Sequence, residues 1–149
     1  MKKITLLILA FILAACSAGE TTDFDKNLSK WNDANISHYR YQLFIGCFCP
    51  FMEDMPITIE VNNGEIVSMT SGKGTAIDAA NPLYEVVNRY STIDRVFLAL
   101  EADQTGDADE VVVAFDPDYG FPANVAVDNI KDAIDDEISY QVSNFEILE

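Results

Sequence analysis

The chain has 149 residues, of which 25 are Asp or Glu and 9 are Lys or Arg, so its formal net charge is −16. A protein this acidic is repelled by nucleic acid and by anionic lipid surfaces, and we expect no nucleic-acid partner. Hydrophobic residues make up 49% of the sequence, which excludes a disordered chain and is enough for the core of one globular domain.

The first 15 residues have the pattern of a secretory signal peptide. Lys2 and Lys3 precede an apolar run over residues 4–15, which is too short to span a bilayer because a spanning helix needs about 20 apolar residues. Cleavage after residue 15 leaves 134 residues and, since both lysines are lost, a net charge of −18. We therefore expect a signal peptide over 1–15, a small polar tether over 16–22 and a single domain over 23–149.

The apolar run ends in Leu13-Ala14-Ala15-Cys16, which resembles the lipobox of bacterial lipoprotein precursors. The resemblance implies that Cys16 receives a diacylglycerol thioether and that the new amine is acylated, for example by palmitate. Several acyl chains together give stable membrane anchoring. The expected location is the bacterial cell envelope, on the periplasmic side of the outer membrane if the host is Gram-negative. An ordinary signal peptide cut at an Ala-x-Ala-like site is the alternative.

Apolar periodicity predicts two helices and six strands in the remaining chain. The predicted elements are a helix at 23–34, strands at 38–49, 57–61 and 65–69, a loop at 70–82, a helix starting at 91, and strands at 110–115, 121–127 and 137–148. Runs of strands separated by single helices are typical of α+β proteins. We expect two helices packed on one face of a mainly antiparallel sheet of about six strands, in the order α-β-β-β-α-β-β-β.

The first hairpin has a predicted register. Asn63-Gly64 is the strongest short hairpin signal, and a two-residue turn at this point pairs Val61 with Ile66. The same register pairs Ile59 with Ser68, so the apolar residues share one face of the sheet.

Three further local patterns predict details of the second helix and of two strands. Ser91-Thr92-Ile93-Asp94 approximates a capping box at the start of the second helix. The continuous apolar run over 110–115 predicts a central strand. The apolar side changes parity within the last strand, which predicts a bulge near Ser143-Asn144.

Cys47 and Cys49 form a matched pair if Cys16 carries lipid, and the expected compartment is oxidising. On an extended strand, residues two apart have Cα atoms about 6.5–7 Å from each other, whereas disulfides prefer roughly 4.4–6.8 Å. A Cys47–Cys49 disulfide is predicted, and it requires a local bend at Gly46 or Pro50. Buried free thiols and a redox or metal role remain alternatives.

Acidic residues around Gly106 are the weak candidates for a metal site. Asp103, Asp107, Asp109 and Glu110 supply carboxylate oxygens of the kind that calcium binds. Their order does not match an EF-hand loop, so a solvated loop is the alternative and no other cofactor is expected.

The sequence contains no recognisable catalytic set. His38 is the only histidine, and no Gly-x-Ser-x-Gly motif is present for a serine nucleophile. We therefore predict no catalytic residues and do not expect an enzyme.

Several short motifs carry a resemblance to a known group of proteins. They are Tyr39-Arg40-Tyr41-Gln42, Cys47-Phe48-Cys49-Pro50, the segment 92–97 and Asp116-Pro117-Asp118-Tyr119-Gly120-Phe121-Pro122. Over most of residues 27–148 the chain resembles a group of bacterial lipoproteins that carry a domain of unknown function. The resemblance supports the architecture and the location and implies no established activity.

The sequence thus predicts a lipid-anchored envelope protein. Its domain is expected to be a non-catalytic binding or structural module that contacts the membrane through its anchor and meets an unidentified envelope protein or ligand. The alternative is a thiol-based redox or metal-handling lipoprotein that uses Cys47 and Cys49.

Overall fold

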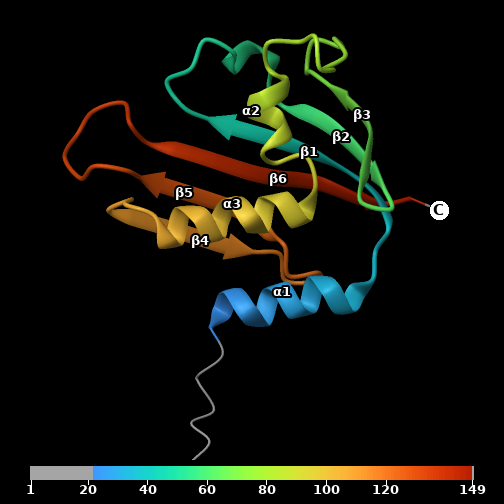
Figure 1. Cartoon of the computed structure of the whole chain (residues 1–149), viewed down its shortest axis with the longest axis horizontal. Coiled ribbons are helices and arrows are strands. Elements are labelled where there is room, and N and C mark those ends of the chain that lie inside the picture. Colours follow the sequence, from blue (N-terminus) through green and yellow to red (C-terminus); the bar gives the residue numbers. More distant parts are fainter. Residues whose placement is uncertain (1–21, 149) are drawn as a thin grey trace, which may run out of the picture.

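The computed structural model describes residues 22–148, so the predicted signal peptide and the lipidation site Cys16 lie outside the described residues. Within this range the chain forms an open six-stranded antiparallel sheet with three α-helices, which confirms the α+β class (Figure 1). The elements are α1 (Asp23–Ala34), β1 (His38–Gly46), the 3₁₀ turn η1 (Met52–Asp54), β2 (Ile57–Asn62), β3 (Glu65–Thr70), α2 (Tyr84–Asn88), α3 (Ile93–Thr105), β4 (Glu110–Phe115), β5 (Pro122–Asp128) and β6 (Ile138–Ile147). None of the helices described is both long and apolar enough to cross a bilayer.

The strand order is β3-β2-β1-β6-β5-β4, so the first three strands and the last three form two halves that meet where β1 pairs with β6. The prediction that residues 110–115 form a central strand is wrong, because β4 pairs with β5 alone and lies at an edge. Val111 and Val113 pack against the core, whereas Val112 between them is 58% exposed. A run of three valines therefore did not require burial on both faces.

The two faces of the sheet differ in what covers them. Side chains that alternate along β1, including Tyr41 and Leu43, are buried against α2 and α3, which lie over one face in Figure 1. Side chains that point the other way, such as Arg40 on β1 and Ala126 on β5, are exposed on the opposite face of the sheet. No helix of residues 22–148 covers this second face, which we call the helix-free face.

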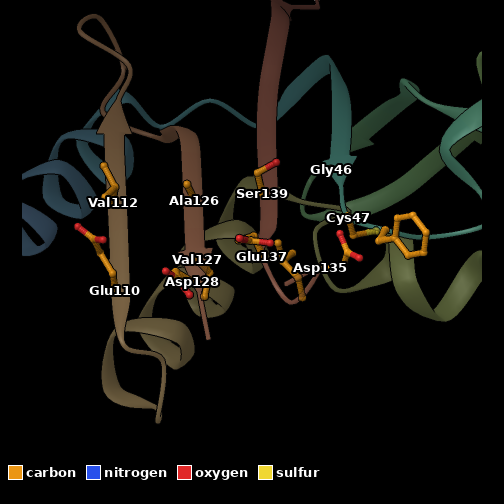
Figure 2. Close-up of a pocket in the computed structure, with 12 residues that line it drawn as sticks. Gly46, Cys47, Glu110, Val112, Ala126, Val127, Asp128, Asp135, Glu137 and Ser139 are labelled. Atoms are coloured by element: carbon orange, nitrogen blue, oxygen red, sulfur yellow. The ribbon is translucent and has the colours of Figure 1, made fainter. Parts of the chain in front are cut away.

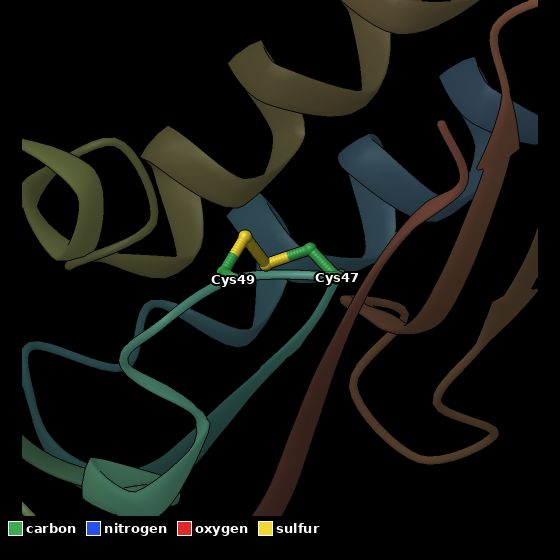
Figure 3. Close-up of a disulfide and its surroundings, with 2 residues drawn as sticks. All are labelled: Cys47 and Cys49. Carbon is green, nitrogen blue, oxygen red and sulfur yellow. A yellow bond between two sulfur atoms is a disulfide. The ribbon is translucent and has the colours of Figure 1, made fainter. Parts of the chain in front are cut away.

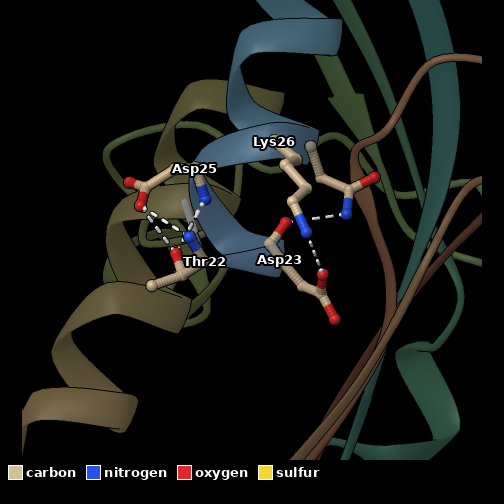
Figure 4. A network of polar contacts seen from close by, with 5 residues as sticks. Thr22, Asp23, Asp25 and Lys26 are labelled. Atoms are coloured by element: carbon tan, nitrogen blue, oxygen red, sulfur yellow. Dashed lines mark hydrogen bonds and ion pairs between the residues drawn. The ribbon is translucent and has the colours of Figure 1, made fainter. Parts of the chain in front are cut away.

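Helix α1 begins at a complete capping box (Figure 4). The Thr22 hydroxyl accepts a hydrogen bond from the Asp25 amide at 3.1 Å, and the Asp25 carboxylate accepts one from the Thr22 amide at 3.2 Å. These two bonds satisfy amides that have no partner within the helix. Trp31 on the buried side of α1 contacts the aromatic rings of Tyr39, Phe121 and Phe145.

Buried tyrosines of the sheet hold both ends of α3. At the start of the helix, the Tyr39 hydroxyl accepts a hydrogen bond from the Ile93 amide at 3.1 Å. In the last turn, the Tyr140 hydroxyl donates a hydrogen bond to the Asp103 carboxylate at 3.0 Å. Burial raises the pKa of Tyr39 to about 12, so its hydroxyl stays protonated throughout the physiological range. The helix is thus fixed by polar contacts as well as by its apolar side.

The start of α3 differs from the prediction. Thr92, and not Ser91, caps the helix by accepting a hydrogen bond from the Arg95 amide at 3.1 Å. Ser91 is fully buried and bonds to the carbonyl of Asn88, the last residue of α2. The five-residue helix α2 was not predicted, because one turn and a half carries too little periodicity to detect.

The hairpin register is confirmed at its turn and wrong beyond it. Asn63 and Gly64 adopt φ values of 51° and 78°, and Val61 pairs with Ile66. A register shift after Glu60 then places Met69 opposite Ile59 in place of Ser68.

The predicted bulge in the last strand is present. Asn144 has a φ of 50°, and the β1–β6 register shifts between Arg40 and Gln42. The shift lets Phe145 join the apolar side of the sheet.

Candidate functional site

The helix-free face contains a hollow of about 420 Å³ at the end of the sheet where β1 and β5 finish and β4 and β6 begin (Figure 2). Four strands and the connection from β5 to β6 contribute to it. Its lining residues are Gly46, Cys47, Phe48, Glu110, Val112, Ala126, Val127, Asp128, Asp135, Glu137, Ile138 and Ser139.

The floor of the hollow is a row of small side chains that are direct neighbours across four strands. We call Val112, Ala126, Ser139 and Gly46 the floor row. The strand registers pair Val112 with Ala126, Ala126 with Ser139, and Ser139 with Gly46. A methyl group on Gly46 would overlap Ser139 Oγ. The absence of a side chain at position 46 therefore leaves space above this end of the floor row.

Carboxylates border the floor row on its outer side. We call Glu110, Asp128, Asp135 and Glu137 the acidic rim, and Figure 2 shows them below the floor row, toward the strand ends. Glu110 and Asp128 are directly opposite each other on β4 and β5, an arrangement of like charges that destabilises a sheet. None of the ion pairs found among residues 22–148 includes a carboxylate of the acidic rim.

Both desolvation and neighbouring carboxylates act on Asp128 in the acidic rim. Desolvation raises the pKa of this carboxyl, and the nearby charges of Asp136 and Glu137 raise it further. The ionised form of Asp128 is thus disfavoured in the folded protein. A cation placed at the rim would relieve this repulsion.

Strand β1 ends at Gly46, so the prediction of a strand that continues to residue 49 is wrong. The chain turns at Phe48, where the Cys49 amide donates to the Cys47 carbonyl at 2.8 Å. This turn brings the Cα atoms of Cys47 and Cys49 to 5.2 Å and their sulfur atoms to 1.99 Å, the distance of a disulfide (Figure 3). The two cysteines therefore close a three-residue turn instead of sharing a strand face.

Phe48 is the residue that sequence reasoning missed. It is 84% exposed, lies between the two bonded cysteines and lines the hollow. An exposed aromatic ring loses little further freedom on binding when its backbone is already held by a disulfide and a hydrogen bond. The position of an aromatic residue inside a Cys-x-Cys motif was the available signal.

Replacing both cysteines with serine is expected to lower the free energy of unfolding by about 1 to 2 kcal/mol. The effect is small because the loop that the bond closes contains only three residues, and a short loop has little entropy to lose. Urea unfolding followed by circular dichroism measures the change, with the wild-type protein in reductant as the second arm. A variant that fails to fold would contradict the prediction.

The predicted calcium candidates are not brought together. Asp103 accepts from Tyr140 and pairs with Arg89 at 2.9 Å on the helix-covered side of the sheet, whereas Glu110 belongs to the acidic rim on the helix-free face. Asp109 accepts from the Lys131 amide at 2.7 Å, and Asp107 is exposed in the loop. In residues 22–148, no three His, Cys, Asp or Glu side chains are grouped to hold one metal ion.

The Asp-Pro-x-Tyr-Gly-x-Pro motif has a structural place away from the hollow. Asp116 accepts from the Asp118 amide at 2.9 Å and from the Tyr119 amide at 2.7 Å, which shapes the turn between β4 and β5. Lys30 of α1 donates to the Pro117 carbonyl, so the turn is a docking point for the helix.

His38 is also structural, because its Nε2 lies 3.0 Å from Glu60 Oε1 on the neighbouring strand. It lies at the start of β1, whereas the hollow is at the end of that strand. The histidine therefore takes no part in the candidate site.

The fold and the hollow define a class of protein: an α+β domain whose open antiparallel sheet has one face covered by helices and one face free. Residues 23–147 match the model of a family of unknown function (DUF6174), and the chain belongs to this family. The match extends from α1 to β6 and agrees with the predicted resemblance to a domain of unknown function. Neither a search of the curated proteins nor a search of the solved structures found a match.

Proposed function

We propose that this protein is a lipid-anchored component of the bacterial cell envelope whose domain binds a partner protein, without catalysis, through the helix-free face. The observation that carries the binding role is Phe48, an aromatic side chain that is 84% exposed on a disulfide-closed turn beside the hollow. Rigid aromatic side chains that contact a pocket are typical anchors of protein interfaces.

The proposed location rests on the amino-terminal sequence and is compatible with the cysteine chemistry. Lys2, Lys3 and the apolar run ending at Cys16 have the order expected of a lipoprotein precursor. A disulfide between Cys47 and Cys49 persists in an oxidising compartment such as the envelope. A domain held at a membrane meets other envelope proteins at high local concentration, which favours a binding role.

Replacing Cys16 with serine is expected to abolish both lipid labelling and membrane retention of the full-length protein. The acyl chains are attached through this thiol in the proposal, so removing the thiol removes the anchor. Labelling with radioactive palmitate and fractionation in a bacterial host measure the two effects. Release of wild-type protein by salt alone would contradict the anchor.

The binding face is tested by site-specific photocrosslinking in intact cells. A benzoylphenylalanine in place of Phe48 is expected to capture a discrete partner. The same residue in place of Leu98, which is 62% exposed on α3, serves as the matched control for exposure. The Phe48 product should disappear when Ala126→Phe fills the floor row, because Ala126 is exposed and does not enter the core. Identical products at both positions would contradict the proposal.

A further inference from the structure

We propose that the hollow receives an arginine or lysine side chain from an extended basic segment of the partner protein. The inference rests on the proposed binding function and names the chemistry of what is bound. The aliphatic part of the side chain lies along the floor row, and its cationic end lies among the carboxylates of the acidic rim.

The shape of the hollow fits such a side chain better than a free metal ion. Carboxylates approach from β4, β5 and the β5–β6 connection around a space of about 420 Å³, and those described form no three-ligand group for one metal. Arginine and lysine combine a long apolar stem with a terminal charge. The floor row matches the stem because it consists of small, largely uncharged side chains, and the rim matches the charge.

The charge distribution favours a basic partner over a neutral one. Glu110 and Asp128 face each other without a basic neighbour in the ion pairs of residues 22–148, and Asp135 and Glu137 add two more charges at the same end of the sheet. Like charges held together destabilise the free protein, and a bound cation removes part of that repulsion. The mature chain, at −18, also attracts basic segments from a distance.

Phe48 argues for a polypeptide segment and against a small amine. Its ring lines the hollow and extends into solvent, so residues on either side of an inserted basic side chain would contact it. Aromatic faces also attract guanidinium groups. A free polyamine would use the rim but leave most of this ring without a contact.

The test uses the full-length protein purified in non-ionic detergent and a fluorescent peptide in which arginine alternates with serine. Citrulline replaces arginine in the control peptide, which keeps the shape and removes the charge. Fluorescence anisotropy is expected to show binding of the arginine peptide that weakens as salt rises, and no binding of the citrulline peptide. Spermine is expected to compete weakly.

Three variants separate the hollow from the overall charge. Glu110→Gln combined with Asp128→Asn is expected to weaken binding about tenfold, since two charge contacts are lost. Ala126→Phe fills the floor row without changing charge and is expected to weaken binding to a similar extent. Asp33→Asn combined with Glu101→Gln removes the same number of charges from exposed positions on α1 and α3 and is expected to leave binding unchanged.

A thermal melt distinguishes lost binding from lost folding. The Glu110→Gln/Asp128→Asn protein is expected to melt about 1–4 °C higher than wild type at neutral pH, because the opposed charges are removed. This gain in melting temperature should shrink as the pH falls toward 3.8, the ordinary pKa of an aspartate carboxyl. The pKa of Asp128 is raised in the native protein, so Asp128 takes up a proton there as the pH falls, and its charge then no longer destabilises the wild type.

Equal binding of the arginine peptide by wild type and by the two hollow variants would overturn the inference. The inference would also be overturned if the citrulline peptide bound as tightly as the arginine peptide, or if spermine competed at the concentration of the peptide itself. If the Phe48 crosslink in cells persists while the arginine peptide does not bind, the proposed function stands and only the basic ligand is rejected.

Discussion

Replacing Trp31 with alanine is expected to lower the free energy of unfolding by about 3 to 5 kcal/mol, a large part of the stability of a domain this size. Trp31 is only 6% exposed, and its ring lies edge-on to Tyr39, Phe121 and Phe145. Its indole N–H donates to Asp94 at 2.9 Å, so one side chain joins α1 to the sheet and to α3. Truncation leaves a cavity where three elements meet.

Two further variants make the Trp31 result specific. Trp31→Phe keeps a ring but removes the bond to Asp94, and is expected to cost about 1 to 2 kcal/mol. Leu98→Ala on the exposed side of α3 is expected to change stability by less than about 0.5 kcal/mol. Because the chain has a single tryptophan, urea unfolding must be followed by circular dichroism. A cost below 1 kcal/mol for Trp31→Ala would show that α1 is not part of the cooperative core.

Replacing Gly120 with alanine is expected to lower the free energy of unfolding by about 2 to 4 kcal/mol. Gly120 has a φ of +83°, which costs an alanine about 1 kcal/mol or more. An added methyl group would also lie 2.7 Å from the Asn27 carbonyl oxygen and 3.0 Å from Lys30 Cβ, both on α1. The backbone of the helix would have to move away from the turn.

Gly64→Ala is the matched control for Gly120→Ala. Gly64 has a similar φ of +78°, but a methyl group there would meet no atom within 4 Å. The control is expected to cost about 1 kcal/mol, and the excess at Gly120 measures the steric conflict with α1. Equal losses in the free energy of unfolding for the two variants would mean that α1 moves away from the turn without an energetic cost.

Local signals explain why most elements could be predicted. The helix at 23–34, the hairpin turn at Asn63-Gly64 and the bulge near Asn144 each depend on a few neighbouring residues, and each is confirmed. The same dependence on neighbours explains the failures. The place of β4 at an edge and the pairing of Ile59 with Met69 depend on strands that meet only in the folded sheet.

The candidate site could not be predicted from the sequence for the same reason. Glu110 and Asp128 are opposite each other only because β4 and β5 pair, and Gly46 meets Ser139 only because β1 pairs with β6. The sequence favoured a different group of acids, Asp103 to Glu110, because they are close along the chain. Folding separates them, since α3 directs Asp103 toward Tyr140 while Glu110 begins an edge strand on which it faces the hollow.

By itself, the sequence determined two of the three α-helices and all six strands of residues 22–148, the α+β class, and the expectation of a lipid anchor at Cys16. Periodicity, turn chemistry and targeting motifs are read over short stretches. Only the tertiary structure decided the order of the strands, the helix-free face and the meeting of Phe48 with the floor row and the acidic rim. These depend on contacts between residues distant in the chain, and such contacts are selected by the packing of the whole core.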